Sequence, residues 1–230
     1  MTAIPYVASA AGKPALPAWV LTRPAEERAA RFVSPSRLGD EEPDFGPASS
    51  PLAEAQGLGR YRRGDLIHRL LQLLPDIAPA EREAAAHRLL ARERDLTEAQ
   101  RTEMAAAALG VLNDAQFAAV FGPGSRAEVA VAGLAPGVGA ISGRVDRLLV
   151  EAGCVLVVDF KTNRPAPARI EDADPAYIRQ MAVYVAVLQT LFPDRPVEAA
   201  LVWTDGPRLM PIPENLTVEA LSGLARSVDT

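Results

Sequence analysis

Apolar and polar residues alternate along the chain with two different periods, and the change between them falls near Arg126. Before Arg126, apolar residues recur every three to four positions, which is the spacing of an amphipathic helix. The first such stretch starts at Asp65 and ends at Pro75. Proline, threonine and acidic residues open the stretches that follow, as expected at helix starts. Helices are therefore predicted over 65–75, 79–94 and 97–113, with a short helix over 114–121.

After Arg126, the apolar residues alternate with period two, which is typical of strands. One strong helical pattern interrupts the strands, and another ends the chain. The strand–helix–strand unit over 155–204 should place its two strands in parallel. The pattern predicts an α/β (α+β) domain with a mixed central sheet and a helical N-terminal part. Its strands are expected over 128–132, 140–150, 154–161, 197–204 and 209–212, and its helices over 175–191 and 217–228.

The first 56 residues differ from the rest, because they hold 8 of the 20 prolines. Prolines at this density are incompatible with a long helix or a central strand. We therefore expect residues 1–56 to form a Pro-rich extended arm or linker, and residues 57–230 to form the domain. Within that domain we expect a helical part over 57–122, a sheet core over 126–213 and a terminal helix over 217–228.

Composition narrows the setting of the protein. Of its 230 residues 49% are hydrophobic and 23% charged, as in a packed domain. No apolar run is long enough to cross a membrane, and no signal peptide is recognisable at the N-terminus. A single cysteine, Cys154, cannot form a disulfide framework or a cysteine-rich metal cluster. These features predict a cytoplasmic protein that does not enter a membrane.

The net charge and the local distribution of charge point in different directions on nucleic-acid binding. The net charge of −5 does not favour DNA binding, but Arg60, Arg62, Arg63 and Arg69 form a local basic cluster. Only 2 of the 24 basic residues are lysines, one of which is Lys161. A lysine in an arginine-rich chain suggests a position where a compact ammonium is needed, although codon bias is an alternative explanation.

Asp159 and Lys161 are the first candidates for chemistry. They follow four apolar residues that predict a strand buried on both faces. Because side chains alternate along a strand, the carboxylate and the ammonium should share one face where the strand ends. A buried charge is costly unless it is paired or ligated. The alternative is an ordinary salt bridge at a strand end.

Asp146 lies on the strand before, and a hairpin connects the two strands. A two-residue loop of Ala152 and Gly153 would place Asp146 opposite Asp159. Two facing carboxylates repel each other, and a divalent cation between them would reverse that effect. A three-residue loop would shift the register by one residue. Neutralisation of the two carboxylates by neighbouring arginines is the other alternative.

Three further residues lie on predicted helices. His68 is at the edge of an apolar stripe, and imidazole suits a divalent-metal site that also has carboxylates. Gln180 and Tyr184 are four positions apart, so they share one helix face. Residues of these types are also common as ordinary half-buried helix residues.

These residues occur in four motifs whose order resembles the nuclease domain of the AddA/RecB family of DNA-break-processing helicases, a PD-(D/E)xK nuclease. The resemblance covers roughly residues 34–205. The first two stretches are similar to the family's G-x-x-x-H-x-x-L helix and G-x-x-D-R strand, and the last two to its D-(Y/F)-K-T strand and Q-x-x-x-Y helix. In this sequence they read Gly64-Asp-Leu-Ile-His68-Arg-Leu-Leu71, Gly143-Arg-Val-Asp146-Arg147, Asp159-Phe-Lys161-Thr162 and Gln180-Met-Ala-Val-Tyr184.

The resemblance implies a restriction-endonuclease-like core and a role for each residue. His68, Asp146 and Asp159 would ligate Mg²⁺ or Mn²⁺, helped by the Phe160 carbonyl. Lys161 would act with Asp146 and Asp159 in catalysis by orienting or activating the attacking water. Gln180 and Tyr184 would shape the site and meet the DNA strand, and Glu128 would add a carboxylate near the metal.

The resemblance also implies a setting, and it has limits. It suggests an exonuclease acting in double-strand break repair and recombination, with a helicase domain in cis and an AddB-like subunit as partners. Related AddB-type nucleases carry four cysteines for an iron–sulfur cluster, which the single cysteine excludes here. No phosphate-binding G-x-x-x-x-G-K-[ST] loop occurs in the sequence. The alternatives are a catalytically silent DNA-end binding module and a restriction or junction-resolving endonuclease on the same fold.

Overall fold

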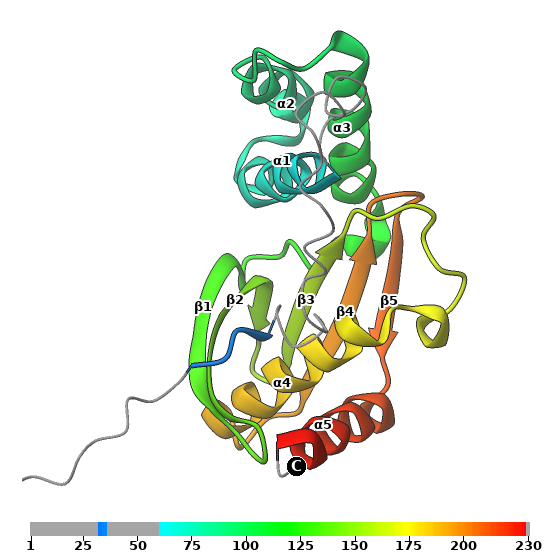
Figure 1. Ribbon diagram of the computed structural model, residues 1–230. Coiled ribbons are helices and arrows are strands. Elements are labelled where there is room, and N and C mark those ends of the chain that lie inside the picture. The colour runs from blue at the N-terminus through cyan, green and yellow to red at the C-terminus, as the bar shows by residue number, and fades with distance from the viewer. Residues whose placement is uncertain (1–31, 36–59, 229–230) are drawn as a thin grey trace, which may run out of the picture. The chain divides into compact units, whose positions relative to one another are not determined.

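The computed structural model describes residues 32–35 and 60–228 (Figure 1). Apart from residues 32–35, the predicted Pro-rich arm lies outside the described residues, as does the Arg60 side chain. Residues 31–230 group into one compact unit. The helices and strands follow one another in the order predicted from the periods of the apolar residues. They are α1 (Arg60–Leu73), α2 (Arg82–Leu90), α3 (Glu98–Leu112), β1 (Ser125–Ala135), β2 (Gly139–Val150), β3 (Val155–Lys161), α4 (Pro175–Leu191), β4 (Val197–Trp203), β5 (Arg208–Ile212) and α5 (Glu214–Val228).

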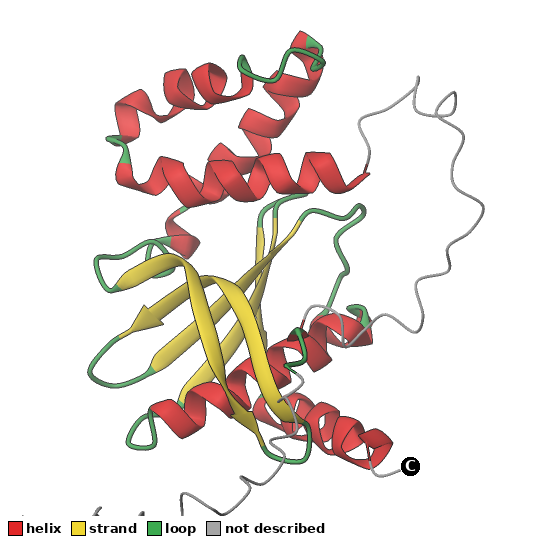
Figure 2. Ribbon diagram, turned by 60° about the vertical axis from the view of Figure 1, so that its left-hand side comes forward, coloured by secondary structure: helices red, strands yellow, loops and turns green. Residues whose placement is uncertain are grey.

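The five strands form one mixed sheet in the order β1-β2-β3-β4-β5. Strands β3 and β4 are parallel, and the other neighbouring pairs are antiparallel. The parallel pair flanks α4, as the strand–helix–strand pattern predicts. Helix α4 lies across the sheet and α5 packs beside α4, while α1, α2 and α3 gather at the ends of the strands (Figures 1 and 2). The predicted fold class, a mixed sheet flanked by helices with a helical N-terminal part, is confirmed.

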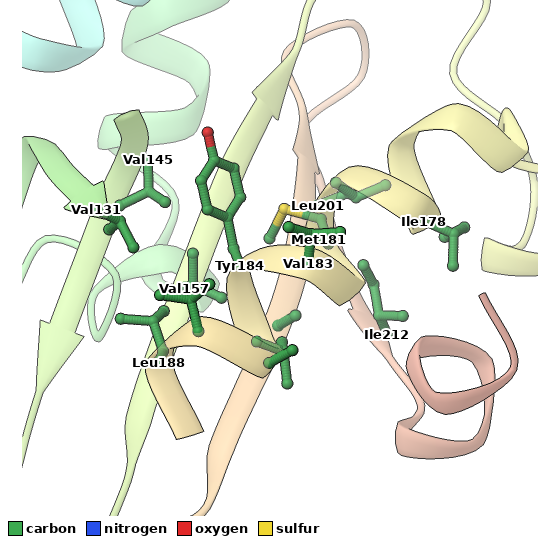
Figure 3. Close-up of a cluster of buried hydrophobic side chains, with 14 of the residues drawn as sticks. Val131, Val145, Val157, Ile178, Met181, Val183, Tyr184, Leu188, Leu201 and Ile212 are labelled. Atoms are coloured by element: carbon green, nitrogen blue, oxygen red, sulfur yellow. The ribbon is translucent and has the colours of Figure 1, made fainter. Parts of the chain in front are cut away.

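Strand β3 is buried on both faces because two separate hydrophobic clusters pack against it. Val155 and Val157 belong to the cluster beneath α4, part of which is drawn in Figure 3. Val158 and Phe160 belong to the cluster formed with α1, α2 and α3. Full burial of such side chains stabilises the fold by about 1.5–3 kcal/mol each. The continuous apolar run of this strand is thereby explained.

Several predicted boundaries shift. Helix α3 begins after Thr97 as expected, because Thr97 and Gln100 form a reciprocal capping box. Helix α2 ends at Leu90, earlier than predicted, and α1 begins five residues before Asp65. The expected helix over 114–121 is only a short 3-10 turn, Ala115–Phe117.

The sheet is irregular where β2 passes Asp146. Strands β1 and β2 keep one register along their length. Glu128 and Asp146 face each other in that register, but they are the one pair of residues that is not paired. Glu128 has a left-handed backbone, with φ of 53°, a conformation that is uncommon for a residue with a side chain. Before this point Val145 faces the α4 cluster, whereas Arg147 reaches the Leu71 carbonyl of α1. The alternation of the strand therefore shifts by one residue at Asp146.

Residues 32–35 contact the sheet at the same strand. Val33 forms an isolated parallel bridge with Ile141. Its amide donates to the Ala140 carbonyl at 2.9 Å, and its carbonyl accepts from the Ser142 amide at 3.2 Å. Because β1 occupies the other edge of β2, Val33 pairs with the edge that β3 leaves free.

No helix in the described part of the chain is long and apolar enough to cross a membrane.

Candidate active site

Asp159 and Lys161 lie together at the C-terminal end of β3, on the face toward α4. The Lys161 Nζ is 2.7 Å from Asp159 Oδ2, and the two side chains are only 11% and 10% exposed. The alternation of the strand brings them onto one face, as predicted. The ion pair is therefore largely shielded from water. Electrostatic interactions are stronger in such a shielded environment than in solvent.

Helix α4 surrounds the lysine with two more groups. Gln180 donates from Nε2 to Asp159 Oδ1 at 3.1 Å and accepts from Lys161 Nζ at 3.3 Å. The Lys161 Nζ also lies 3.8 Å from the centre of the Tyr177 ring, a cation–π contact. The Tyr177 hydroxyl in turn contacts Asn163 Nδ2. The ammonium is thus held by a carboxylate, an amide and an aromatic face.

Tyr184, one turn beyond Gln180, is buried and only 1% exposed. Its ring lies beside Val145 (Figure 3), and its hydroxyl donates to the Arg144 carbonyl at 2.9 Å. Burial raises the pKa of Tyr184 to about 12, and the negative charge of Asp159 adds to the effect. The residue fits closely, because a Cβ added to Gly143 would stand 2.6 Å from the hydroxyl. In this structure Tyr184 joins α4 to β2 and is not exposed for contact with DNA.

Asp146 enters the site from β2. The register between β2 and β3 is the one predicted from the two-residue loop, since Arg147 pairs with Val158 and Val150 with Val155. The ladder stops before Asp146, however, so the expected backbone pair with Asp159 does not form. Instead, Asp146 Oδ2 accepts a hydrogen bond from the Phe160 amide at 2.7 Å. The carboxylate takes the place of a strand partner, because β2 turns away from β3 at this residue.

His68 reaches the same carboxylate from α1. Its Nδ1 lies 3.3 Å from Asp146 Oδ1, and its ring meets the Phe160 ring edge-on at 6.0 Å. Burial lowers the pKa of His68, but the hydrogen bond to Asp146 and the charges of Asp146 and Asp159 outweigh that effect, so the pKa is raised. The site thus has two sides: His68 with Asp146, and Asp159 with Lys161.

The surroundings of Asp159 raise the pKa of its carboxyl group. Burial raises its pKa, and the charge of Asp146 adds to this, although the Lys161 ammonium lowers it. Its Oδ2 forms an ion pair with Lys161, yet this buried oxygen lacks a hydrogen bond of good geometry. Buried polar atoms of this kind are uncommon in folded proteins and often mark functional positions.

The donor set suits a hard divalent cation in its chemistry. Two carboxylates and an imidazole are available, and oxygen donors are what Mg²⁺ and Mn²⁺ prefer. The incompletely satisfied Asp159 Oδ2 is an acceptor that a cation could serve. As the side chains stand, each carboxylate is engaged by protein groups, and no three His, Cys, Asp or Glu side chains within residues 32–35 and 60–228 converge as a metal-binding group.

Other predicted residues are less directly placed. Glu128, opposite Asp146 on β1, lies 3.6 Å from Arg144 rather than against His68 or Lys161. In the basic cluster, Arg62 pairs with Glu93 and Asp95. Arg63 pairs with Glu103. Acidic residues from α3 and from the segment between α2 and α3 therefore pair with two of the four arginines of the predicted basic cluster.

Two contributors were not identified as site residues from the sequence. The spacing of Tyr177 places it on the same helix face as Gln180, but it indicated no role for the ring. Asn163 was missed, because a polar residue two positions after Lys161 carries no spacing that distinguishes it from a loop residue.

Comparison with known proteins gives one family. Residues 46–221 match the model of the PD-(D/E)XK nuclease superfamily. No curated protein matches the chain.

Two solved structures show only distant likeness. A protein from Eubacterium rectale described as a "Putative exonuclease" is 16% identical over 69% of this chain, with a TM-score of 0.46. The chain spans 65% of that protein's length. The protein SSO0001 is 15% identical over 71% of this chain and 75% of its own, with a TM-score of 0.28. Both scores are below 0.5, so these likenesses add nothing to the family match.

Proposed function

Because the chain belongs to the PD-(D/E)XK nuclease superfamily, we propose that it is a metal-dependent deoxyribonuclease whose catalytic residues are Asp146, Asp159 and Lys161. One observation carries this proposal. The two carboxylates come from neighbouring strands, lie close enough for Asp146 to raise the pKa of Asp159, and have the Lys161 ammonium 2.7 Å from Asp159. An arrangement of buried carboxylates and one ammonium is unusual for a purely structural strand end.

The proposed metal ligands are His68, Asp146 and Asp159, with Mg²⁺ or Mn²⁺ as the ion. A divalent cation supplies charge that polarises the phosphodiester and acidifies water. The pairing of His68 with Asp146 and of Lys161 with Asp159 means that binding would replace protein contacts rather than fill a ready cage. We therefore expect metal affinity to be modest in the absence of DNA.

Lys161 and α4 supply the rest of the proposed chemistry. The ammonium, fixed by Asp159, Gln180 and Tyr177, would sit beside the scissile phosphate, offset its charge and orient water. Gln180, which is partly exposed, is the proposed DNA contact on this helix. Tyr184 would act indirectly, by holding the Arg144 carbonyl and thus the backbone that leads to Asp146.

The wider proposal is a role in double-strand break processing, as the nuclease part of an AddAB- or RecBCD-like helicase–nuclease. It rests on the order of the four motifs. A helicase domain in cis and an AddB-like subunit would then be its partners, and exonuclease action from a DNA end its mode. A restriction or junction-resolving endonuclease would share the same site but would cut closed DNA.

End-labelled single-stranded and duplex DNA, and a closed circular duplex, test the proposal together. Each is incubated with the protein in Mg²⁺, in Mn²⁺ or in EDTA, with Lys161→Ala as the matched inactive variant. The expected result is metal-dependent cleavage of the linear substrates that Lys161→Ala lacks. Cleavage of the circle would favour the endonuclease. DNA binding without cleavage in either metal would contradict the proposal and support a silent DNA-end binding module.

A further inference from the structure

Helix α1 is attached to the end of β3 by one arginine. Arg63 donates to both carboxylate oxygens of Glu103 on α3, at 2.7 and 3.1 Å. Its third contact is with the Thr162 carbonyl at 2.8 Å. Thr162 directly follows Lys161, and the Arg63 side chain is only 17% exposed. A guanidinium with a bidentate carboxylate contact has a fixed orientation, so it joins α1, α3 and the catalytic strand at one point.

The next residue shows how close this attachment is. Gly64 faces Thr162, and a Cβ added there would lie 3.0 Å from the Thr162 Oγ1. His68 is four residues further along α1, hence on the same helix face, and meets Phe160 two residues before Thr162. Four residues of a helix rise about 6 Å, and two strand residues span about 6.6 Å. Fixing Gly64 at Thr162 therefore brings His68 within reach of Phe160 and Asp146.

A second guanidinium supports the other end of α1. Arg147, buried and 5% exposed, donates to the Leu71 carbonyl at 3.3 Å, and its guanidinium lies over the Phe121 ring. Leu71 follows His68 by three residues. The part of α1 that carries His68 is thus held to the sheet by contacts on both sides of it.

We propose that Arg63 is a positioning residue of the site, which holds His68 against Asp146 by joining Glu103 to the Thr162 carbonyl. Its consequence for metal binding rests on the proposed function, whereas its effect on His68 does not. The arginine acts through the helix, since its hydrogen bonds go to Glu103 and Thr162 and not to either carboxylate of the site.

Arg62 provides a matched comparison. It precedes Arg63 on the same helix and also makes two ion-pair contacts, with Glu93 and Asp95 at 2.7 and 2.8 Å. Its side chain is more exposed, and its hydrogen bonds go to acidic residues between α2 and α3, not to the catalytic strand. Loss of Arg62 removes an arginine and its ion pairs from α1 without touching Thr162.

The first measurement is the imidazole spectrum of the ¹⁵N-labelled full chain, in EDTA and at one fixed pH. The chain has two histidines, so His87 on α2 is an internal reference. Arg63→Ala should move the His68 signals toward those of free imidazole and leave those of His87 in place. Arg62→Ala should change neither. Equal changes in both variants, or no change in either, would overturn the proposal.

The second measurement is Mn²⁺ affinity by calorimetry, without DNA. Residues that orient metal ligands typically contribute 10–100-fold in affinity, and we expect about tenfold weaker binding in Arg63→Ala but not in Arg62→Ala. If the parent chain binds no Mn²⁺, the proposed function fails, and the imidazole spectrum alone decides the role of Arg63.

A milder variant keeps the test decisive if Arg63→Ala does not fold. Glu103→Gln retains the shape of the partner but weakens its hold on Arg63, and should shift the His68 signals in the same direction by a smaller amount. An unchanged His68 spectrum in Glu103→Gln would then overturn the proposal.

Discussion

The two carboxylates of the site lie on adjacent strands but in different surroundings. On the α4 side, Asp159 is part of a regular, largely buried strand and pairs with Lys161 at 2.7 Å. On the α1 side, Asp146 lies where the pairing of β2 is interrupted, and is held by the Phe160 amide and His68. The difference separates a carboxylate fixed by an ion pair within one strand from a carboxylate whose position depends on a backbone amide and on helix α1.

Asp159→Asn should have the largest effect, because it removes the buried charge that pairs with Lys161. A bound cation contributes several kcal/mol to such reactions, so cleavage should fall on the order of 10³-fold. Single-turnover cleavage of labelled DNA measures this loss. Asp172→Asn, which removes a carboxylate paired with Arg169 in an exposed loop, is the control and should be near the parent rate. Activity of Asp159→Asn within tenfold of the parent would remove Asp159 from the catalytic group.

Lys161→Arg should have the next largest effect. We expect its cleavage rate to fall on the order of 10²-fold, the scale expected for a positioned catalytic group. The space between Tyr177, Gln180 and Asp159 holds a compact ammonium, and a planar guanidinium cannot place its charge at the same point. The rate at saturating metal is the measurement, with Arg208→Lys, at the exposed first residue of β5, as the control. A rate within about threefold of the parent would show that any positive charge serves here.

His68→Ala should chiefly change the requirement for metal. We expect the Mg²⁺ concentration for half-maximal cleavage to rise about tenfold, with a smaller change in the maximal rate. Titration of cleavage against Mg²⁺ gives both quantities. His87→Ala is the matched control. If the two histidine variants have the same titration, the α1 side takes no part in holding metal.

Tyr177 tests how much the aromatic face contributes to Lys161. Tyr177→Leu removes the cation–π contact, whose range of about 0.5–1 kcal/mol at accessible sites corresponds to a rate loss of a few fold. Tyr177→Phe keeps the ring and loses only the contact with Asn163, so it should lie nearer the parent rate. Identical rates for both variants would assign the effect to the hydroxyl instead.

The smallest effect concerns pH and stability in EDTA. Because the folded pKa of His68 is raised, chiefly by Asp146 against the opposing effect of burial, folding favours its protonated form. The stability from this pair is fully present below the unfolded pKa of about 6.5, and is lost as pH rises through the folded value. The parent should therefore exceed His68→Ala in melting temperature by more at acidic than at alkaline pH. A pH-independent difference would contradict the pairing.

The regular parts of the site could be predicted from the sequence. The apolar run before Asp159 indicates a strand buried on both faces, and alternation then puts Lys161 beside it. The bounds of α4 are the predicted ones, because Pro175 starts the helix and its apolar face is continuous. The hairpin register also follows from the short loop at Ala152 and Gly153.

The irregular parts could not be predicted, because they depend on long-range contacts. Asp146 was expected to pair with Asp159 across the ladder, but the left-handed backbone at Glu128 has no signal in a residue type that usually avoids it. The neutralisation of Arg62 and Arg63 depends on acidic residues at least 31 positions away. The spacing put Tyr184 on the same helix face as Gln180, but it carries no signal that the hydroxyl bonds to the Arg144 carbonyl within the fold.

The contact between Val33 and β2 has a consequence for how the protein is produced. A chain shortened to begin at Arg60 would keep all five strands but lose the segment that caps the Ala140 carbonyl and the Ser142 amide. Open strand edges are templates for pairing with another molecule. We expect such a shortened chain to self-associate through β2, so expression boundaries drawn only around the helices and strands would leave this strand edge open.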